Sequence, residues 1–380
     1  MSEAGVYLHI PFCRSRCSYC DFATDVFTNG EAVERYVSAL VKEIETAFSV
    51  HQSLTINRRI DTIYFGGGTP SLLTARQIEK ILGSINKKFF IQTNAEITME
   101  MNPATVTLET LREYKNLGVT RASFGVQTFD DVELRRLGRK HTARDVRETI
   151  ELLRAADFTN VSFDLIAGLP RQSLLDWERN LDCAFELNPE HLSLYILEIH
   201  EATPLAEQIR SGRQPLPDED LAAAMFKLII EKTAAKNYRQ YEISNFSLPG
   251  FESRHNSKYW TLDPIFGFGC SAHSFDGQNR RYSNERDTSR YVRLIEEGNS
   301  AIVEDTQTDT KSEYVFLGLR LTEGINLKKY QNLFNVDLRE EYKADLKRLE
   351  EFELIDLKEN CLRLTTKGML YSNEVFAVFV

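Results

Sequence analysis

Three cysteines lie close together near the start of the chain, in the run Cys13-Arg14-Ser15-Arg16-Cys17-Ser18-Tyr19-Cys20. This C-x3-C-x2-C spacing has no fourth cysteine beside it. An iron–sulfur site that only transfers electrons usually has four cysteines, whereas three thiolates hold three irons of a 4Fe–4S cubane and leave the fourth iron open. The spacing therefore predicts a cluster that binds and activates a ligand.

Two other arrangements of these thiols are a half zinc site, with His9 nearby, and a disulfide pair plus one spare cysteine. Zinc would want a fourth ligand, and usually two C-x2-C pairs. The remaining cysteines, Cys183, Cys270 and Cys361, are scattered and form no second framework. The cluster hypothesis is preferred, and a thiolate cluster without a secretory leader predicts a reducing, cytoplasmic location.

A glycine run, Gly66-Gly67-Gly68-Thr69-Pro70, follows an apolar stretch typical of a strand. Three successive glycines let the backbone approach a ligand closely. The run matches neither the G-x-G-x-x-G pattern nor a P-loop, so it does not indicate a site for nucleotide phosphates.

Strand-like and helix-like runs alternate over the first part of the chain. The predicted strands are Val6–Pro11, Thr62–Gly66, Ala95–Met101, Arg121–Gln127, Asn160–Ala167 and His191–Ile199. The predicted helices are Glu31–Phe48, Ala75–Lys88, Leu108–Leu117, Ala143–Ala156, Leu174–Leu187 and Glu219–Lys236. This alternation predicts an α/β fold with a parallel sheet and right-handed crossovers. Six units rather than eight predict an open, partial (β/α)6 barrel.

The predicted strands carry polar residues on one face, because side chains alternate with a period of two. These residues are Glu96, Thr98, Glu100 and Asn102 in the third strand, Ser123, Gly125 and Gln127 in the fourth, and Ser162 and Asp164 in the fifth. A closed barrel is filled with Val, Ile and Leu, so this face predicts a polar cavity that holds a ligand. The alternative is a different strand parity, with the acids facing solvent.

The remaining residues suggest two further regions after a core of residues 1–236. Residues 237–305 are predicted to be an irregular, aromatic-rich α+β segment. Residues 306–380 are predicted to form a small unit of three helices and a hairpin, similar to a winged helix. Its 338–353 stretch has six acids against four bases, whereas a DNA-reading helix should be net basic. We therefore expect a structural or partner-docking module.

The segment 237–305 contains the run His255-Asn256-Ser257-Lys258-Tyr259-Trp260. Histidine can ligate haem iron, and Tyr and Trp can stack on a flat macrocycle. An aromatic plug at a domain junction is the alternative, and the residues alone leave both open. His273 is a second candidate ligand, although a core histidine is the expected role.

Five segments, taken in order, resemble the family of oxygen-independent coproporphyrinogen III oxidases and their radical S-adenosylmethionine (SAM) relatives. They are Tyr7–Cys13, Gly66–Pro70, Glu100–Pro103, Gly125–Gln127 and Asp164–Pro170. The resemblance covers roughly the first 240 residues and is specific because several motifs agree in order.

This resemblance implies a 4Fe–4S cluster on Cys13, Cys17 and Cys20, with SAM bound at its open iron. The implied SAM-contacting residues are Tyr7, Tyr19, Gly67, Gly68, Thr69, Glu100, Gln127, Arg139 and Asp164. In these roles Glu100 accepts from the SAM amino group, Arg139 pairs with the carboxylate, and Asp164 accepts from a ribose hydroxyl. Tyr19 packs near the cluster or the adenine.

Two features depart from the oxidase pattern. The run Cys20-Asp21-Phe22 lacks the further cysteine of the oxidases, and only twelve residues precede Cys13. Both features are similar to a sister branch of haem chaperones, whose H-N-x-x-Y-W hallmark is present. The resemblance thus implies haem contact through His255, Tyr259 and Trp260. A haem chaperone is the preferred hypothesis over an enzyme, and oxidative decarboxylation of coproporphyrinogen III is the alternative.

Composition sets the remaining expectations. The 380 residues are 42% hydrophobic and 27% charged, with a net charge of −10, which argues against nucleic-acid binding as the main function. No apolar run reaches the ~18 residues of a membrane span. The expected partners are haem or a porphyrin, a respiratory haem-acceptor protein and, in a homodimer, a second copy. Peripheral membrane docking through a partner is compatible with this surface.

Overall fold

The computed structural model describes residues 3–26, 29–50 and 58–380. It confirms the open partial barrel. Its parallel core consists of β1 (Ala4–Ile10), β4 (Arg59–Gly67), β5 (Phe90–Met101), β6 (Arg121–Gln127), β7 (Val161–Ala167) and β8 (His191–Ile196). The further strands are β2 (Phe12–Cys13), β3 (Asp25–Val26), β9 (Arg239–Gln240), β10 (Asn245–Ser247), β11 (Ile265–Phe268), β12 (His273–Phe275), β13 (Arg280–Asn284), β14 (Ile302–Gln307), β15 (Ile325–Asn326), β16 (Ile355–Lys358) and β17 (Cys361–Leu364).

The helices follow the predicted order, and short ones are added. They are α1 (Gly30–Val50), η1 (Pro70–Leu72), α2 (Ala75–Lys88), α3 (Leu108–Asn116), α4 (Asp131–Arg136), α5 (Ala143–Ala155), α6 (Leu174–Glu186), α7 (Pro204–Arg210), α8 (Glu219–Ala235), α9 (Arg254–Thr261), α10 (Thr288–Glu296), α11 (Thr310–Gly318), α12 (Leu327–Phe334), α13 (Leu338–Glu341), α14 (Lys343–Glu351), α15 (Thr366–Leu370) and α16 (Ser372–Phe376). Capping boxes at Thr74, Thr107, Thr142 and Ser173 fix where α2, α3, α5 and α6 begin.

One sheet joins most of these strands. In the described part of the chain its order is β14-β13-β12-β11-β1-β4-β5-β6-β7-β8-β10-β9. The pairs from β1 to β8 are parallel, and β11 adds a parallel strand on the other side of β1. The remaining strands pair antiparallel at both edges. Residues 237–305 thus extend the same sheet in both directions, and the division into three domains stays a prediction.

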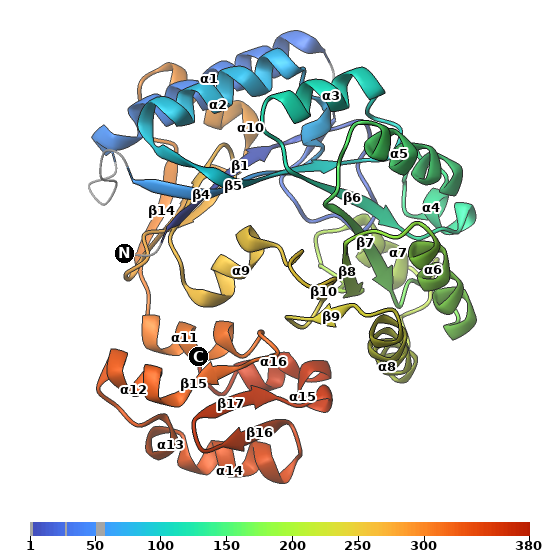
Figure 1. Ribbon diagram of the computed structural model, residues 1–380, viewed down its shortest axis with the longest axis vertical. Coiled ribbons are helices and arrows are strands. Elements are labelled where there is room, and N and C mark those ends of the chain that lie inside the picture. The colour runs from blue at the N-terminus through green and yellow to red at the C-terminus, as the bar shows by residue number, and fades with distance from the viewer. Residues whose placement is uncertain (1–2, 27–28, 51–57) are drawn as a thin grey trace.

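The two faces of the sheet differ as the alternation predicts. Val6, Leu8 and Ile10 of β1 are fully buried, and α1, α2 and α3 cover this side (Figure 1). The concave side carries Tyr7 and His9. The polar set is enclosed rather than solvent-facing: Glu96, Thr98, Ser123 and Ser162 are all buried. The strand parity predicted from the sequence is therefore confirmed.

The C-terminal module, predicted as residues 306–380, contains the predicted helices and hairpin around an apolar core to which Ile243 also contributes. One of the three predicted helices is two in the structure, because α13 and α14 meet at Tyr342, and the short strand β15 pairs with β17. The module attaches where Glu242 bridges to Leu321 and the Ile243 N–H donates to the Arg320 carbonyl (3.1 Å). Figure 1 shows α9 lying between the sheet and this module.

Within the described residues, no helix combines the length and apolarity that crossing a membrane requires.

Candidate functional site

The three clustered cysteines lie at the carboxyl end of the barrel strands. Cys13 ends β2, and Cys17 and Cys20 follow in the next loop; all three are half-buried free thiols. This loop is held by the Ser18 N–H, which donates to the Leu137 carbonyl (2.9 Å), and by Ser15 Oγ, which donates to the Gly138 carbonyl (3.2 Å). Burial raises the pKa of the Cys13 thiol to about 11 and also raises that of Cys20. Iron binding must therefore displace these protons.

The three thiols do not surround a single ion position. Among the described residues, no three His, Cys, Asp or Glu side chains gather around one ion position. A cubane binds each thiolate to a different iron, so its ligands need not converge on one point. His9, the neighbouring candidate, has both ring nitrogens engaged: Nε2 bonds the Ala23 carbonyl (2.8 Å), and Nδ1 bonds Tyr7 Oη (3.1 Å).

The glycine run forms the wall beside Cys13. Gly67 has a φ of +109°, and a Cβ there would lie 2.7 Å from the His9 ring. A Cβ on Gly68 would lie 2.7 Å from the Phe12 carbonyl oxygen, and the Gly68 N–H donates to the Ile10 carbonyl (2.8 Å). These glycines thus let the turn approach the chain just before the cysteines, a close contact within the protein in addition to any contact with a ligand.

Arg139 and Asn102 connect the glycine turn to the cysteines. Thr69 Oγ1 contacts Cys13 Sγ (3.6 Å) and accepts from Asn102 Nδ2 (2.9 Å). Arg139 Nη2 donates to Asn102 Oδ1 (2.6 Å), and its Nη1 contacts Cys17 Sγ (3.6 Å). Burial works against the Arg139 charge, but the anionic forms of Tyr19 and the cysteines raise its pKa. Asn102 was missed as a site residue, although its place on the polar strand face was the available signal.

Glu100 is a half-buried carboxylate without an ion pair among the described residues. Tyr64 Oη donates to one oxygen (2.7 Å) and the Gly67 N–H to the other (3.1 Å). Burial raises the pKa of Glu100 to about 7. The carboxylate retains free acceptor capacity and would gain from a cationic or N–H-bearing ligand.

The other predicted SAM-contacting residues lie around the same end. Burial raises the pKa of Asp164 to about 6, although hydrogen bonds from Ser193 and Ser123 act to lower it. Gln127 ends β6 with a φ of +68°, and Tyr19 packs against Leu137, Ile166 and Leu169. Tyr7 lies deeper: its ring stacks on Tyr64 (6.1 Å between centroids) and approaches His255 (6.5 Å). The structure therefore brings most of the set together and places Tyr7 nearer the middle of the barrel.

Helix α9, which carries the H-N-x-x-Y-W run, closes the opposite end of the barrel. His255 is 1% exposed, and its Nδ1 bonds Thr62 Oγ1 (2.9 Å). Its backbone N–H donates to Glu96 (3.0 Å), and its ring stacks on Tyr64 (5.0 Å). Burial, helped by the Lys258 charge, lowers the pKa of His255 to about 3. In this arrangement His255 serves as part of a plug, the alternative raised from the sequence.

Ion pairs fasten α9 to the sheet. Asp61 pairs with Lys258 Nζ (2.8 Å) and Arg254 Nη2 (3.0 Å). At the other end of the helix, the Arg320 guanidinium lies over the Trp260 ring (4.3 Å), and Arg320 also pairs with the buried Glu242 (3.4 Å). Helix α9 is therefore a wedge between the barrel and the C-terminal module. Its partners are distant in sequence, so no local signal predicted them.

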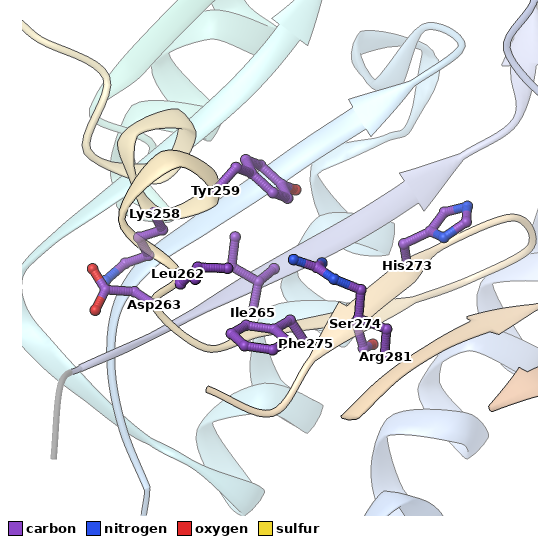
Figure 2. A pocket seen from close by; sticks show the side chains of 9 residues that line it. All are labelled: Lys258, Tyr259, Leu262, Asp263, Ile265, His273, Ser274, Phe275 and Arg281. Carbon is purple, nitrogen blue, oxygen red and sulfur yellow. The ribbon is translucent and has the colours of Figure 1, made fainter. Parts of the chain in front are cut away.

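A small pocket lies between α9 and strands β11 to β13 (Figure 2). Its lining residues are Lys258, Tyr259, Leu262, Asp263, Ile265, His273, Ser274, Phe275 and Arg281. Figure 2 shows the Arg281 side chain reaching toward Ile265 and α9 while His273 turns away. His273 is exposed, so the expectation of a core histidine is wrong. The residue pairs with Ser283 through its backbone in the short strand β12, and its side chain points away from the sheet on the open face.

The fold matches a solved structure closely. The coproporphyrinogen III oxidase HemN of Escherichia coli superposes with a TM-score of 0.85 at 23% identity, over 99% of this chain and 90% of that one. At this identity the likeness concerns the fold.

Family models and curated relatives identify the chain further. The "Radical SAM superfamily" model matches residues 7–184, and that superfamily implies a 4Fe–4S cluster and SAM; the "HemN C-terminal domain" model matches residues 305–371. "Heme chaperone HemW" of Bacillus subtilis is 36% identical over 99% of both chains. The Lactococcus lactis protein of the same name is 34% identical over 99% of this chain and 97% of its own. The chain belongs to the HemW family within the radical SAM superfamily.

Proposed function

We propose that this protein is a haem chaperone, which binds haem and delivers it to an acceptor protein. The observation that carries the proposal is the whole-chain similarity to relatives named as haem chaperones in several bacteria. A respiratory acceptor, a homodimeric state and a cytoplasmic location belong to the same proposal. The comparisons do not favour the oxidase alternative, because the oxidase resembles this chain in fold at lower identity.

The carboxyl end of the barrel would hold the cluster and SAM. Cys13, Cys17 and Cys20 would ligate the cluster, and the Gly67–Thr69 turn would line the SAM site beside Cys13. When bound, the pair supplies one-electron cleavage of the SAM sulfonium. Glu100 would accept from the SAM amino group, and this role agrees with the free acceptor capacity of its half-buried carboxylate. Arg139 would pair with the SAM carboxylate.

The remaining contacts would position the rest of SAM. Asp164 would accept from a ribose hydroxyl, with Gln127 and Tyr19 beside it. Tyr7 would act one layer deeper, through its contact with Tyr64. All of these residues lie on the concave face or in the loops at its carboxyl end, which supports a single continuous site.

Haem would bind beside α9, in contact with His255, Tyr259 and Trp260. A neutral imidazole is the form that ligates iron, and burial keeps His255 neutral. Its Nε2 has only a long contact, 3.5 Å, with Tyr259 Oη. Because His255 is buried, ligation through it requires α9 to move outward. His273, exposed at the adjacent pocket, is the alternative axial ligand and needs no such movement.

An anaerobic optical titration with haemin tests this proposal. We expect a saturable one-to-one Soret shift with the cluster-reconstituted protein, and weakened binding in either His255→Ala or His273→Ala, whichever removes the axial ligand. His200→Ala is the matched control, since His200 is an exposed histidine beyond β8. Absence of saturable binding in the wild-type protein would refute the haem-chaperone proposal.

A transfer measurement completes the test. The haem-loaded protein would be mixed with a haem-free b-type cytochrome, and the acceptor spectrum followed after separation. Transfer faster than from free haemin at the same concentration supports delivery, whereas transfer no faster than from albumin-bound haem contradicts it.

A further inference from the structure

A positive charge faces the pocket between α9 and strands β11 to β13. The Arg281 side chain comes from β13 and reaches toward Ile265 and α9 (Figure 2). Its guanidinium lies over the Phe275 ring, 4.5 Å from the ring centroid, and this contact holds its orientation. The pocket has a volume of about 280 Å³, at the lower end of the range for ligand pockets. A fixed cation therefore lines a hollow that can admit part of a ligand.

The partner of this cation is a carboxylate of the C-terminal module. Arg281 Nε donates to Glu313 Oε1 (2.9 Å), and Arg281 Nη2 donates to Glu313 Oε2 (2.8 Å). Glu313 lies in the first turn of α11, so the ion pair joins the sheet to the module. Among the described residues, no hydrogen bond involves Arg281 Nη1. This nitrogen carries two further N–H donors, which are left for a ligand.

The other formal charges on the helix side of the pocket are committed or distant. Lys258 has a buried side chain, and its Nζ pairs with Asp61 (2.8 Å) under α9. Figure 2 places the Asp263 carboxylate on the α9 side, away from the Arg281 guanidinium. Of the lysine and arginine residues that line the pocket in the described chain, Arg281 is therefore the one placed to receive an anion.

Much of the remaining lining is apolar or aromatic. These side chains are Tyr259, Leu262, Ile265 and Phe275. The matching ligand has a flat apolar body with a carboxylate at its edge, because a guanidinium binds a carboxylate through two parallel hydrogen bonds. Haem has this chemistry, since both of its propionate carboxylates leave one edge of the macrocycle. The size of the pocket suits that edge rather than the whole ring.

Helix α11, which supplies Glu313, also holds α9 in place. The two helices pack against each other. Arg320, two residues beyond the end of α11, lies over the Trp260 ring of α9 (4.3 Å). The module is thus fastened on one side of α9 through Glu313 and on the other through Arg320. Ligation by His255 requires α9 to move outward, so loss of either fastening favours that movement.

We propose that Arg281 binds a carboxylate of haem in this pocket, in exchange for Glu313. The inference rests on the proposed haem-chaperone function and names the residue that recognises the acidic edge of the ligand. One carboxylate replaces another, so the guanidinium is never left unpaired. The Glu313 side chain is 14% exposed in the ion pair and becomes hydrated when displaced. Haem binding thereby loosens the hold of α11 on α9.

The test compares two ligands that differ in their carboxylates alone. Haemin and haemin dimethyl ester, in the same dilute detergent, are titrated into the full-length protein, and Kd is taken from the Soret absorbance. The variants are Arg281→Gln and Glu313→Gln. Arg280→Gln is the matched control, because Arg280 is the next residue of β13 and pairs with Asp305 in the same two-bond manner (2.8 and 2.6 Å). The side chains of Arg280 and Arg281 are similarly exposed, 29% and 33%.

We expect wild type to bind haemin about tenfold more tightly than the ester, which corresponds to one charge-assisted carboxylate contact. Arg281→Gln should bind both ligands with the affinity that wild type has for the ester. Glu313→Gln leaves Arg281 without a competitor, so it should bind haemin at least about threefold more tightly than wild type and bind the ester unchanged. Arg280→Gln should keep the wild-type preference.

The outcomes separate this inference from the function on which it rests. Saturable binding of both ligands with equal affinity in wild type, or a preference retained in Arg281→Gln, would overturn the inference and leave the haem-chaperone proposal standing. Equal tightening of both ligands in Glu313→Gln would also overturn it, because Glu313 would then act on α9 and not on the carboxylate site. Absence of saturable binding of either ligand to wild type would refute both. If Arg281→Gln does not fold, Glu313→Gln still decides.

Discussion

The two ends of the barrel differ in how their charged groups are partnered. At the α9 end, Asp61 holds Lys258 and Arg254, and Glu96 accepts two backbone N–H groups. At the cysteine end, Glu100 forms no ion pair among the described residues, and its hydrogen-bond partners are Tyr64 Oη and the Gly67 N–H. Groups paired within the chain keep an end closed, whereas unpaired groups are available to ligands. The difference indicates that one end is built for closure and the other for binding.

Removing a thiolate from the open end should have the largest effect. In Cys13→Ala, two cysteines remain, and we expect loss of the cluster, from about four irons per chain to background. Iron analysis and absorbance near the cluster band check this after anaerobic reconstitution. Cys183→Ala is the control, because Cys183 is a half-buried thiol on α6 outside the loop. A full cluster in Cys13→Ala would contradict the assignment.

Removing a charge from the closed end should cost stability. Asp61→Asn leaves the Lys258 ammonium buried without its partner, so we expect a loss of about 3 kcal/mol in the free energy of unfolding. Glu296→Gln breaks the exposed pair with Arg35, which water and salt already screen, and should leave the free energy of unfolding almost unchanged. Urea unfolding measures both variants. Equal losses would show that the ion pairs do not fasten α9.

The Glu100 carboxylate at the cysteine end should make the stability of the protein depend on pH. Burial raises the folded-state pKa of Glu100 to about 7, above its ordinary value of 4.5. The folded protein then binds more protons than the unfolded chain, so stability without SAM falls as the pH rises from about 4.5 to 7. Over this pH range, we expect the free energy of unfolding of Glu100→Gln to fall by about 1–3 kcal/mol less than that of wild type. Urea unfolding at several pH values checks this, and parallel pH curves would contradict it.

Much of the barrel could be predicted from sequence. The six βα units have strong periodicity, and threonine or serine caps mark helix starts such as Thr74 and Ser173. The polar strand face was also predictable, since Glu100 and Thr98 alternate with methionine and isoleucine. Local pattern was enough because each of these features arises from neighbouring residues.

The rest depended on contacts between distant residues. Strands β9 and β12 have two and three residues, too few to show alternation. The burial of His255 depends on Thr62 and Glu96, and the exposure of His273 depends on the position of its strand on the open face. Asn102 gains its role only when the fold brings Thr69 and Arg139 to it.

The position of β1 has a consequence for how the chain folds. This first strand lies between β4 and β11, with Gly5 opposite Ile265. One edge of β1 therefore stays unpaired on the ribosome until about two-thirds of the chain has been made. Pairings of such large sequence separation slow folding, and an unpaired edge strand invites association with other chains. The barrel that would hold the cofactors is thus complete only late in synthesis, after α9 and then β11 have been made.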